Sequence, residues 1–274
     1  MRRIRFRGPN GIEDGAVEAG VILTRNGDHI EPLDLDRLTL PDPYELLLPL
    51  EPPEVWCAGV TYERSRDARI EESAVRDVYS LVYDAERPEL FLKDAACRRT
   101  VGPGEPVGVR SDSAWNVPEP EIALVLGDGG EIAGYTIGND VSSRSIEGAN
   151  PLYLPQAKVY AGACALGPAV VSPPPDEAFE IRLHVFDAAG EALFSGETST
   201  ARMKRSFEEL VEYLLRDNPV PAGSVLLTGT GLVPPDDFTL EPGHVVEIEV
   251  PGIGILSNPV VLASSLMERS AAHV

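Results

Sequence analysis

Three acidic residues are spaced so that their side chains can meet at one point. Glu119 and Glu121 are separated by one residue in a segment that predicts a β-strand, so their carboxylates project from the same face. A glycine-rich turn at 127–130 reverses the chain, and the following segment ends at Asp140. A hairpin of this length returns Asp140 to the two glutamates. The spacing therefore predicts a cluster of three carboxylates.

The chemistry of this cluster is that of a hard metal site. Three carboxylates without histidine or cysteine suit Mg²⁺, Mn²⁺ or Ca²⁺ and do not suit zinc. A Glu-x-Glu pair in an acidic protein is more often a solvated strand face. Here, however, residues 122–126 are apolar without alternation, which predicts a strand buried on both faces. Carboxylates beside such a strand require a cation, so we predict a divalent metal at Glu119, Glu121 and Asp140.

A lysine follows this cluster closely along the chain. Lys158 lies 18 residues after Asp140, in a chain with 20 arginines and only three lysines. Lysine differs from arginine because it can lose its proton when it is desolvated. A neighbouring metal ion and burial would lower the pKa of Lys158, which could then serve as a general base. The alternative is an ordinary ion pair between Lys158 and one of the carboxylates.

The composition narrows the classes of ligand. The 274 residues include 44 acidic and 23 basic ones, which gives a formal net charge of −21. This charge argues against binding to nucleic acid, which needs clustered basic residues, and against anionic membrane surfaces. An anionic substrate would need a local positive feature such as a metal ion. The 43% hydrophobic content is sufficient for a folded core.

Cysteine usage and the N-terminal sequence bear on location. The three cysteines, Cys57, Cys97 and Cys164, are far apart and form no CxxC motif, which argues against a disulfide framework or zinc ribbon. The basic first residues reach Gly8 and Pro9 without an apolar stretch, unlike a signal peptide. No run approaches the roughly 18 apolar residues of a membrane span. We therefore expect a cytoplasmic protein.

The remaining pattern predicts a β-rich α+β fold, because few helices stand among many short strands. Residues 1–53 are expected to form a small β domain and a proline-rich linker, and 54–274 the catalytic domain. Helices are predicted at 62–83 and at 206–216, the second with a capping box formed by Ser206 and Glu209. Further strands are predicted at 121–126, 132–136, 180–187, 224–228 and 245–250, beside an N-terminal hairpin with strands near 3–7 and 16–24.

The order of several motifs resembles the fumarylacetoacetate hydrolase superfamily over residues 54–262. The resemblance rests on Pro-Glu-x-Glu at Glu119 and Glu121, Gly-Tyr-Thr-x-Gly-Asn ending at Asp140, Lys158, Leu227-Thr-Gly-Thr-Gly231 and Gly252-Ile-Gly-Ile-Leu-Ser-Asn258. It implies a mixed β-roll fold around a divalent cation, with Mg²⁺ expected and Mn²⁺ or Ca²⁺ as alternatives. Members bind 2-oxo acids on the metal and form dimers, so a homodimer or dimer of dimers is expected.

Four further segments resemble the 2-keto-3-deoxy-D-arabinonate dehydratase branch of this superfamily. They are Gly59-Val-Thr-Tyr-Glu-Arg-Ser65, Arg87-Pro-Glu-Leu-Phe-Leu-Lys93, Ser143-Arg-Ser-Ile-Glu-Gly148 and Asn150-Pro-Leu-Tyr-Leu-Pro-Gln-Ala-Lys158. The resemblance implies a lyase that removes water from a 2-keto-3-deoxy sugar acid, giving 2,5-dioxopentanoate in oxidative pentose degradation. Fold-level likeness alone does not settle the reaction.

The resemblance also implies roles for individual residues. Lys158 is expected to remove a C3 proton of the substrate, and Glu89 to donate a proton to the leaving C4 hydroxyl. Thr230 is expected to bind the substrate carboxylate, with an ordinary tight turn as the alternative. Lys93 is expected to contact the substrate or Glu89, with a surface ion pair as the alternative. Ser143 and Arg144, which follow Asp140 closely, complete the predicted substrate-binding set.

Two other functions remain open at this stage. Hydrolases and decarboxylases of the superfamily carry a water-activating histidine shortly after the first core strand, but residues 58–69 contain none. This absence argues against the first alternative, a hydrolase or decarboxylase of a small acylpyruvate or other 2-oxo acid. The second alternative is a non-catalytic protein that binds a divalent metal or ligand.

Overall fold

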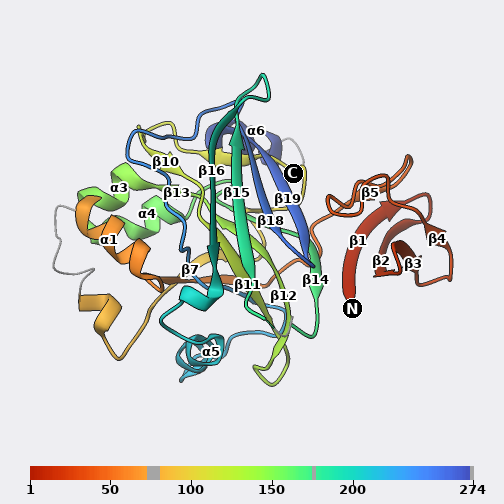
Figure 1. Cartoon of the computed structure of the whole chain (residues 1–274), viewed down its shortest axis with the longest axis horizontal. Helices are drawn as coiled ribbons and strands as arrows, with labels where there is room; N and C mark the ends of the chain where they lie inside the picture. Colours follow the sequence, from red (N-terminus) through yellow and green to blue (C-terminus); the bar gives the residue numbers. More distant parts are fainter. Residues whose placement is uncertain (73–80, 175–176, 272–274) are drawn as a thin grey trace.

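The structure is a computed structural model that describes residues 1–72, 81–174 and 177–271. It is rich in strands, with a long twisted sheet and a shorter sheet packed on it (Figure 1). This arrangement agrees with the predicted β-rich α+β class. No described helix has both the length and the apolar composition that a membrane crossing requires.

The larger sheet has twelve strands among the described residues, and ten of them follow the order β4-β3-β2-β1-β14-β12-β11-β17-β6-β7. β5 pairs with β1, and β8 pairs with β14. The strands are β1 (Arg2–Gly8), β2 (Gly11–Glu18), β3 (Val21–Thr24), β4 (His29–Ile30), β5 (Glu45–Leu46), β6 (Glu54–Gly59), β7 (Glu89–Ala95), β8 (Thr100–Val101), β11 (Pro120–Leu126), β12 (Ile132–Asp140), β14 (Cys164–Val171) and β17 (Val225–Leu227).

The shorter sheet runs β16-β15-β18-β19-β9, and a separate two-stranded ladder joins β10 to β13. These strands are β9 (Val107–Val109), β10 (Asn116–Val117), β13 (Ser142–Ser143), β15 (Glu180–Phe186), β16 (Ala192–Ser199), β18 (Val245–Val250) and β19 (Gly254–Leu262). The described helices are α1 (Glu63–Glu72), α3 (Arg144–Ala149), α4 (Leu154–Lys158), α5 (Phe207–Leu215) and α6 (Ala263–Ala271), with 3-10 turns at Pro151–Tyr153 and Thr200–Arg202.

Strand β11 is the centre of the packing. Its even-numbered side chains, such as Ile122 and Leu124, belong to the core cluster shared with β15 and β18 of the shorter sheet. Its odd-numbered side chains, Ala123 and Val125, pack in a second cluster on the opposite face, with Leu227 of β17. Every residue of β11 is buried. The predicted strand buried on both faces is therefore confirmed.

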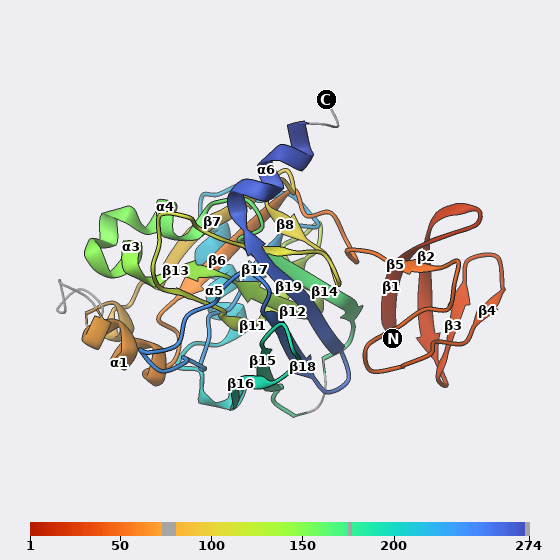
Figure 2. The ribbon, with the colours of Figure 1, turned by 90° about the horizontal axis from the view of Figure 1, so that it is seen from above.

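The N-terminal strands β1–β5 lie at one end of the molecule in both ribbon views (Figures 1 and 2). They surround an apolar cluster of their own that includes Ile4, Phe6 and Ile22. Strand β1 also pairs with β14 through Arg2↔Val171 and Arg3↔Val170. The division of the chain at residues 53 and 54 stays a prediction.

One local prediction in this N-terminal region was wrong. Residues 16–24 do not form one strand, because the chain turns at Ala19 and Gly20, where φ is +49° and +86°. Positive φ at both central residues fits the tight turns of β-hairpins, and β2 and β3 pair across it. The short strand β5, which pairs with β1, was not predicted.

The helix predictions can be checked in part. Of the segment 62–83, α1 covers Glu63–Glu72 and residues 81–83 are helical, whereas 73–80 lie outside the described residues. The helix predicted at 206–216 is confirmed as α5, and its first turn is capped by Ser206, which accepts a hydrogen bond from Glu209 N. Glu209 does not complete the predicted box, since its carboxylate pairs with Arg205. The short helices α3 and α4 were not predicted.

Leu124→Ala should test the role of β11 in the core. Leu124 is fully buried between the sheets, so its truncation leaves a cavity, and we expect the free energy of unfolding to fall by about 2–5 kcal/mol. Leu193→Ala, at an exposed position on β16, should change it by less than about 0.5 kcal/mol. Chemical denaturation measures both values, and equal losses would contradict the assigned packing.

Candidate active site

The three predicted carboxylates come together in the structure. Glu119, Glu121 and Asp140 each offer an oxygen, and these oxygens lie within 4.8 Å of one another. The exposed fractions of the three residues are 3%, 1% and 2%. A buried, all-oxygen set of this kind has the donor chemistry of a site for a hard divalent cation.

The β11–β12 hairpin produces this convergence. Its register pairs Glu121 with Gly138, and Asp140 N donates a hydrogen bond of 3.0 Å to Glu119 O. Glu119 lies just before β11, where its own N–H donates to the side chain of Asn139 at 3.1 Å. The hairpin therefore fixes the backbones of all three acidic residues, as the sequence predicts.

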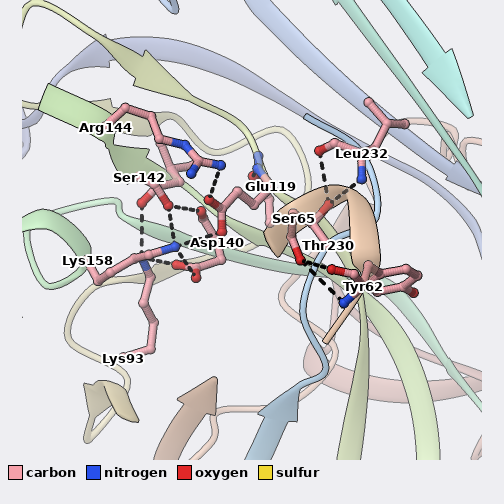
Figure 3. Close-up of polar contacts among 12 residues, drawn as sticks. Tyr62, Ser65, Lys93, Glu119, Asp140, Ser142, Arg144, Lys158, Thr230 and Leu232 are labelled. Atoms are coloured by element: carbon pink, nitrogen blue, oxygen red, sulfur yellow. Dashed lines mark hydrogen bonds and ion pairs between the residues drawn. The ribbon is translucent and has the colours of Figure 1, made fainter. Parts of the chain in front are cut away.

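Lys158 lies against two of the carboxylates (Figure 3). Its ammonium donates to Glu119 Oε2 at 2.7 Å and to Asp140 Oδ2 at 2.8 Å, and also to Ser142 Oγ at 2.6 Å. Helix α4 ends at Lys158, and the side chain is buried. The ion pairs considered as an alternative for Lys158 thus exist, and they place its amine inside the acidic cluster.

Lys93 also lies in this cluster, but not as expected. It is fully buried on β7, where its ammonium pairs with Asp140 Oδ1 and donates to Val141 O at 3.0 Å. The alternative of a surface ion pair was therefore wrong. The two lysines occupy different oxygens of Asp140.

Arg144 and the backbone of Gly229 contact the other two carboxylates. Arg144, at the start of α3, pairs with Glu119 Oε1 at 2.9 Å, and Gly229 N donates to Glu121 Oε2 at 2.6 Å. Gly229 has a φ of +90°, and a Cβ atom there would collide with Thr61 Oγ1. Only glycine therefore allows the loop after β17 to approach Glu121 in this conformation.

The cluster forms one side of a small cavity. Other charged residues that line it are Glu89, Arg144, Glu147 and Lys158, and Ser65 and Thr230 add hydroxyl groups. Its volume is about 20 Å³, which is room for about one water molecule. Glu89 reaches this space across Gly59, where a Cβ atom would collide with the Glu89 carboxylate. The structure thus brings Glu89, Lys158 and Thr230 to the metal-ligand candidates.

Ser143 differs from this group. Its hydroxyl donates to Ser113 Oγ at 2.8 Å, and it is not among the cavity-lining residues described. Its neighbour Ser142 bonds Lys158 instead. The expected contact of Ser143 with substrate therefore finds no support, because the two adjacent serines of β13 face different neighbours.

Sequence reasoning missed two members of the site. Glu147 is buried in α3 and lines the cavity, and it lies within the motif 143–148 that carried the resemblance. The amide of Gly229 lies in the glycine-rich loop that was singled out for Thr230. Both motifs were recognised in the sequence, but the positions of the Gly229 amide and the Glu147 carboxylate relative to the site depend on the tertiary structure.

Burial makes the charge on Glu121 costly. Desolvation, followed by the negative charges of Asp140 and Glu119, holds the pKa of the Glu121 carboxyl well above its ordinary value. In the folded chain, Glu121 therefore keeps its proton to a higher pH than in the unfolded chain. A divalent cation among the three carboxylates would compensate for this cost.

Comparisons with known proteins agree with this site. Residues 54–261 match the family model described as fumarylacetoacetate (FAA) hydrolase C-terminal. A relative from Haloferax volcanii named probable 2-keto-3-deoxyxylonate dehydratase is 50% identical over 240 residues, which cover 87% of this chain and 80% of the relative. The 2-dehydro-3-deoxy-D-arabinonate dehydratase of Saccharolobus solfataricus is 47% identical over 221 residues, covering 77% and 73% of the two chains.

A solved structure is similar over nearly the whole chain. It is described as 2-keto-3-deoxy-D-arabinonate dehydratase complexed with magnesium and 2,5-dioxopentanoate. The TM-score is 0.84 at 37% identity, and the match covers 95% of this chain and 98% of the other.

Glu121→Gln should separate two effects of the buried Glu121 charge: the loss of stability in the metal-free protein and the binding of Mg²⁺. The amide keeps an acceptor for Gly229 N but cannot ionise. Ionisation of Glu121 destabilises the metal-free fold as pH rises above the ordinary carboxyl range near about 4.3. The metal-free variant should therefore match or exceed the wild type in melting temperature at pH 8, while stabilisation by added Mg²⁺ disappears.

Thermal denaturation with and without MgCl₂ measures both effects. Glu180→Gln, at an exposed position on β15, serves as the matched control and should keep the wild-type response to Mg²⁺. Retention of Mg²⁺-dependent stabilisation by Glu121→Gln would refute Glu121 as a ligand.

Proposed function

The chain belongs to the fumarylacetoacetate hydrolase family, and we propose that within it the protein is a Mg²⁺-dependent dehydratase of 2-keto-3-deoxy sugar acids. It converts 2-keto-3-deoxy-D-arabinonate to 2,5-dioxopentanoate and water, a step of oxidative pentose degradation. The observation that carries this assignment is the cavity, in which Lys158 and Glu89 accompany three buried carboxylates.

The metal of this proposal is Mg²⁺, with Mn²⁺ or Ca²⁺ as alternatives. Glu119, Glu121 and Asp140 would hold it, since their oxygens converge and no softer donor is among the three. When bound, the cation stabilises the negative charge that develops on the C2 oxygen of a 2-oxo acid as a C3 proton leaves. It also offsets the repulsion between a substrate carboxylate and the strongly acidic chain.

Lys158 is the proposed base for the first proton. Its amine lies beside the metal-ligand candidates, 2.7 Å from Glu119 Oε2, on the wall of the small cavity next to them. Removal of a C3 proton requires that Lys158 be neutral when the substrate arrives. Ser142 Oγ, 2.6 Å from Nζ, holds the amine in position.

Glu89 is the proposed acid for the leaving group. A protonated Glu89 donates its proton to the C4 hydroxyl, which departs as water while a C3–C4 double bond forms. Loss of a C5 proton and tautomerisation then yield the C5 aldehyde of 2,5-dioxopentanoate. The net change is the loss of one water, so no oxidant or reductant is needed.

The remaining residues are proposed to bind the substrate. Thr230 lines the cavity, and its hydroxyl lies 3.2 Å from both the N and the O of Leu232, so it must exchange a local bond to reach the substrate carboxylate. Arg144 supplies a buried guanidinium on the same cavity. Lys93 acts from behind Asp140 and not on the substrate.

The substrates named for the two dehydratase relatives are more alike than their names suggest. D-Arabinonate and D-xylonate differ only at C2 and C3. Once C2 is a ketone and C3 a methylene, the two D-series acids are the same molecule, with one stereocentre at C4. The open stereochemical question is therefore the configuration at C4.

Hydrolysis and decarboxylation are less well supported. Residues 58–69 contain no histidine, and the cavity wall formed by the described residues contains none. His184 bonds Ser195 and His244 accepts from Glu241 N, both outside the cavity. The proposal also includes a cytoplasmic location, a homodimer or dimer of dimers, and no nucleic-acid or membrane partner.

The purified protein with Mg²⁺ should convert 2-keto-3-deoxy-D-arabinonate to 2,5-dioxopentanoate. Mass spectrometry identifies the product, and the C4 enantiomer and an acylpyruvate are tested in parallel. Cleavage of the acylpyruvate with no change in the sugar acid would identify a hydrolase instead. Binding of metal and pyruvate without turnover of any 2-oxo acid would identify a non-catalytic protein.

Lys158→Met should lower kcat by about 10²–10⁴-fold, the usual contribution of a positioned base, and Glu89→Gln should do the same. Both variants should still bind Mg²⁺, as measured by calorimetry, because neither removes a proposed ligand. Lys204→Met is the matched control, since Lys204 pairs with Asp84 on the surface. Wild-type kcat in Lys158→Met would overturn its role as the base.

A further inference from the structure

Each carboxylate of the metal-ligand triad has one oxygen bound by a donor from another segment of the chain. Arg144 Nη2 lies 2.9 Å from Glu119 Oε1. Gly229 N donates to Glu121 Oε2 at 2.6 Å. Lys93 Nζ pairs with Asp140 Oδ1. We call Arg144, Gly229 N and Lys93 the three outer donors.

The outer donors are held in place by burial. Arg144 is 2% exposed and Lys93 is fully buried. Lys93 Nζ also donates to Val141 O at 3.0 Å, and Tyr160 Oη donates to the same carbonyl at 3.1 Å. A carboxylate that broke its contact would leave a buried cation or N–H without that partner, which is costly. The donors therefore fix the orientation of the carboxylates.

The opposite oxygens of two carboxylates point to a common place. Glu119 Oε2 and Asp140 Oδ2 both accept hydrogen bonds from Lys158 Nζ, at 2.7 and 2.8 Å. Figure 3 shows the two carboxylates meeting at this ammonium, with Arg144 and Lys93 reaching the cluster from different sides. Glu119 and Asp140 thus each present one oxygen to Lys158 and the other to an outer donor, and Glu121 has one oxygen bound by Gly229 N.

We propose that the three outer donors restrict Glu119, Glu121 and Asp140 to one metal-binding oxygen each, and that this restriction selects Mg²⁺ or Mn²⁺ over Ca²⁺. This inference rests on the proposed metal site and names what determines its specificity. Lys93 is a positioning residue in this account, because it acts through Asp140.

The selectivity follows from the coordination that each ion prefers. Mg²⁺ requires six oxygens in near-octahedral geometry, whereas Ca²⁺ takes six to eight and readily binds both oxygens of a carboxylate. Three single oxygens from the protein leave three octahedral positions for substrate oxygens or water. Binding of Ca²⁺ through both oxygens of a carboxylate would need the oxygens that the outer donors already hold, so Ca²⁺ would lose these favourable ligands.

Lys93→Met tests the proposal on the intact, metal-free protein. Calorimetric titrations with MgCl₂ and CaCl₂ give the two dissociation constants. In the wild type, the Kd for Ca²⁺ should exceed that for Mg²⁺. In Lys93→Met, Asp140 can offer both oxygens, and the ratio Kd(Ca²⁺)/Kd(Mg²⁺) should fall by about tenfold or more, as for other changes around metal ligands.

The ratio Kd(Ca²⁺)/Kd(Mg²⁺) distinguishes a change in the number of metal-binding oxygens from a change in the charge of the site. Loss of a buried positive charge strengthens the binding of both divalent ions alike and leaves their ratio unchanged. Lys204→Met, which removes a surface lysine, should change neither constant. Arg144→Met releases Glu119 in the same way and should also lower the ratio, so it serves as the test if Lys93→Met does not fold.

Three outcomes would decide against the proposal in different ways. A wild type that binds Ca²⁺ more tightly than Mg²⁺ overturns it, and so does an unchanged ratio in a folded Lys93→Met or Arg144→Met. In either case the metal site and the proposed dehydratase stand. Failure of the wild type to bind either ion would instead refute the proposed function.

Discussion

The structure depends on keeping three carboxylates ionised inside a protein core. Glu119, Glu121 and Asp140 are almost completely removed from water, and an isolated charge in such a place is very unfavourable. Lys93, Arg144 and Lys158 compensate Glu119 and Asp140 directly. Glu121 instead accepts a hydrogen bond from a backbone N–H, that of Gly229, and burial raises the pKa of its carboxyl well above the ordinary value. The three cationic side chains thus lie against Glu119 and Asp140, and a divalent cation would bring positive charge to Glu121 as well.

The sheets and the short helices beside them bring the acidic residues and their positively charged partners together. Strand β11 carries Glu121 from the apolar core to the cavity, and its partner β12 delivers Asp140. The compensating groups come from remote parts of the chain: Lys93 from the edge strand β7, Arg144 and Lys158 from the short helices α3 and α4, and the Gly229 amide from the loop after β17. Because each of these segments meets the acidic cluster, the same contacts that neutralise the carboxylates also tie the edge of the sheet to its centre.

The sequence predicts best the contacts that form within one hairpin. One hairpin joins Glu119, Glu121 and Asp140, so the period of a strand and the position of a glycine-rich turn were enough to bring them together. The scarcity of lysine also pointed to the site, since Lys93 and Lys158 are both buried in it and Lys204 lies at the surface. The contacts of Lys93 and Gly229 could not be predicted because they join segments far apart in the chain, and that of Arg144 depends on a short helix that was not predicted. The sequence also could not show that Ser142, and not Ser143, contacts Lys158. Adjacent residues of a strand face opposite sides, and the sequence of a two-residue strand does not reveal which residue faces which side.

The size of the cavity has a consequence for how the protein works. A space of about 20 Å³ is far too small for a five-carbon sugar acid, and its walls include Ser65 of α1 as well as the strands of the core. Binding of a ligand of that size therefore requires the walls of the cavity to move apart, so the described conformation is not the one that holds the substrate.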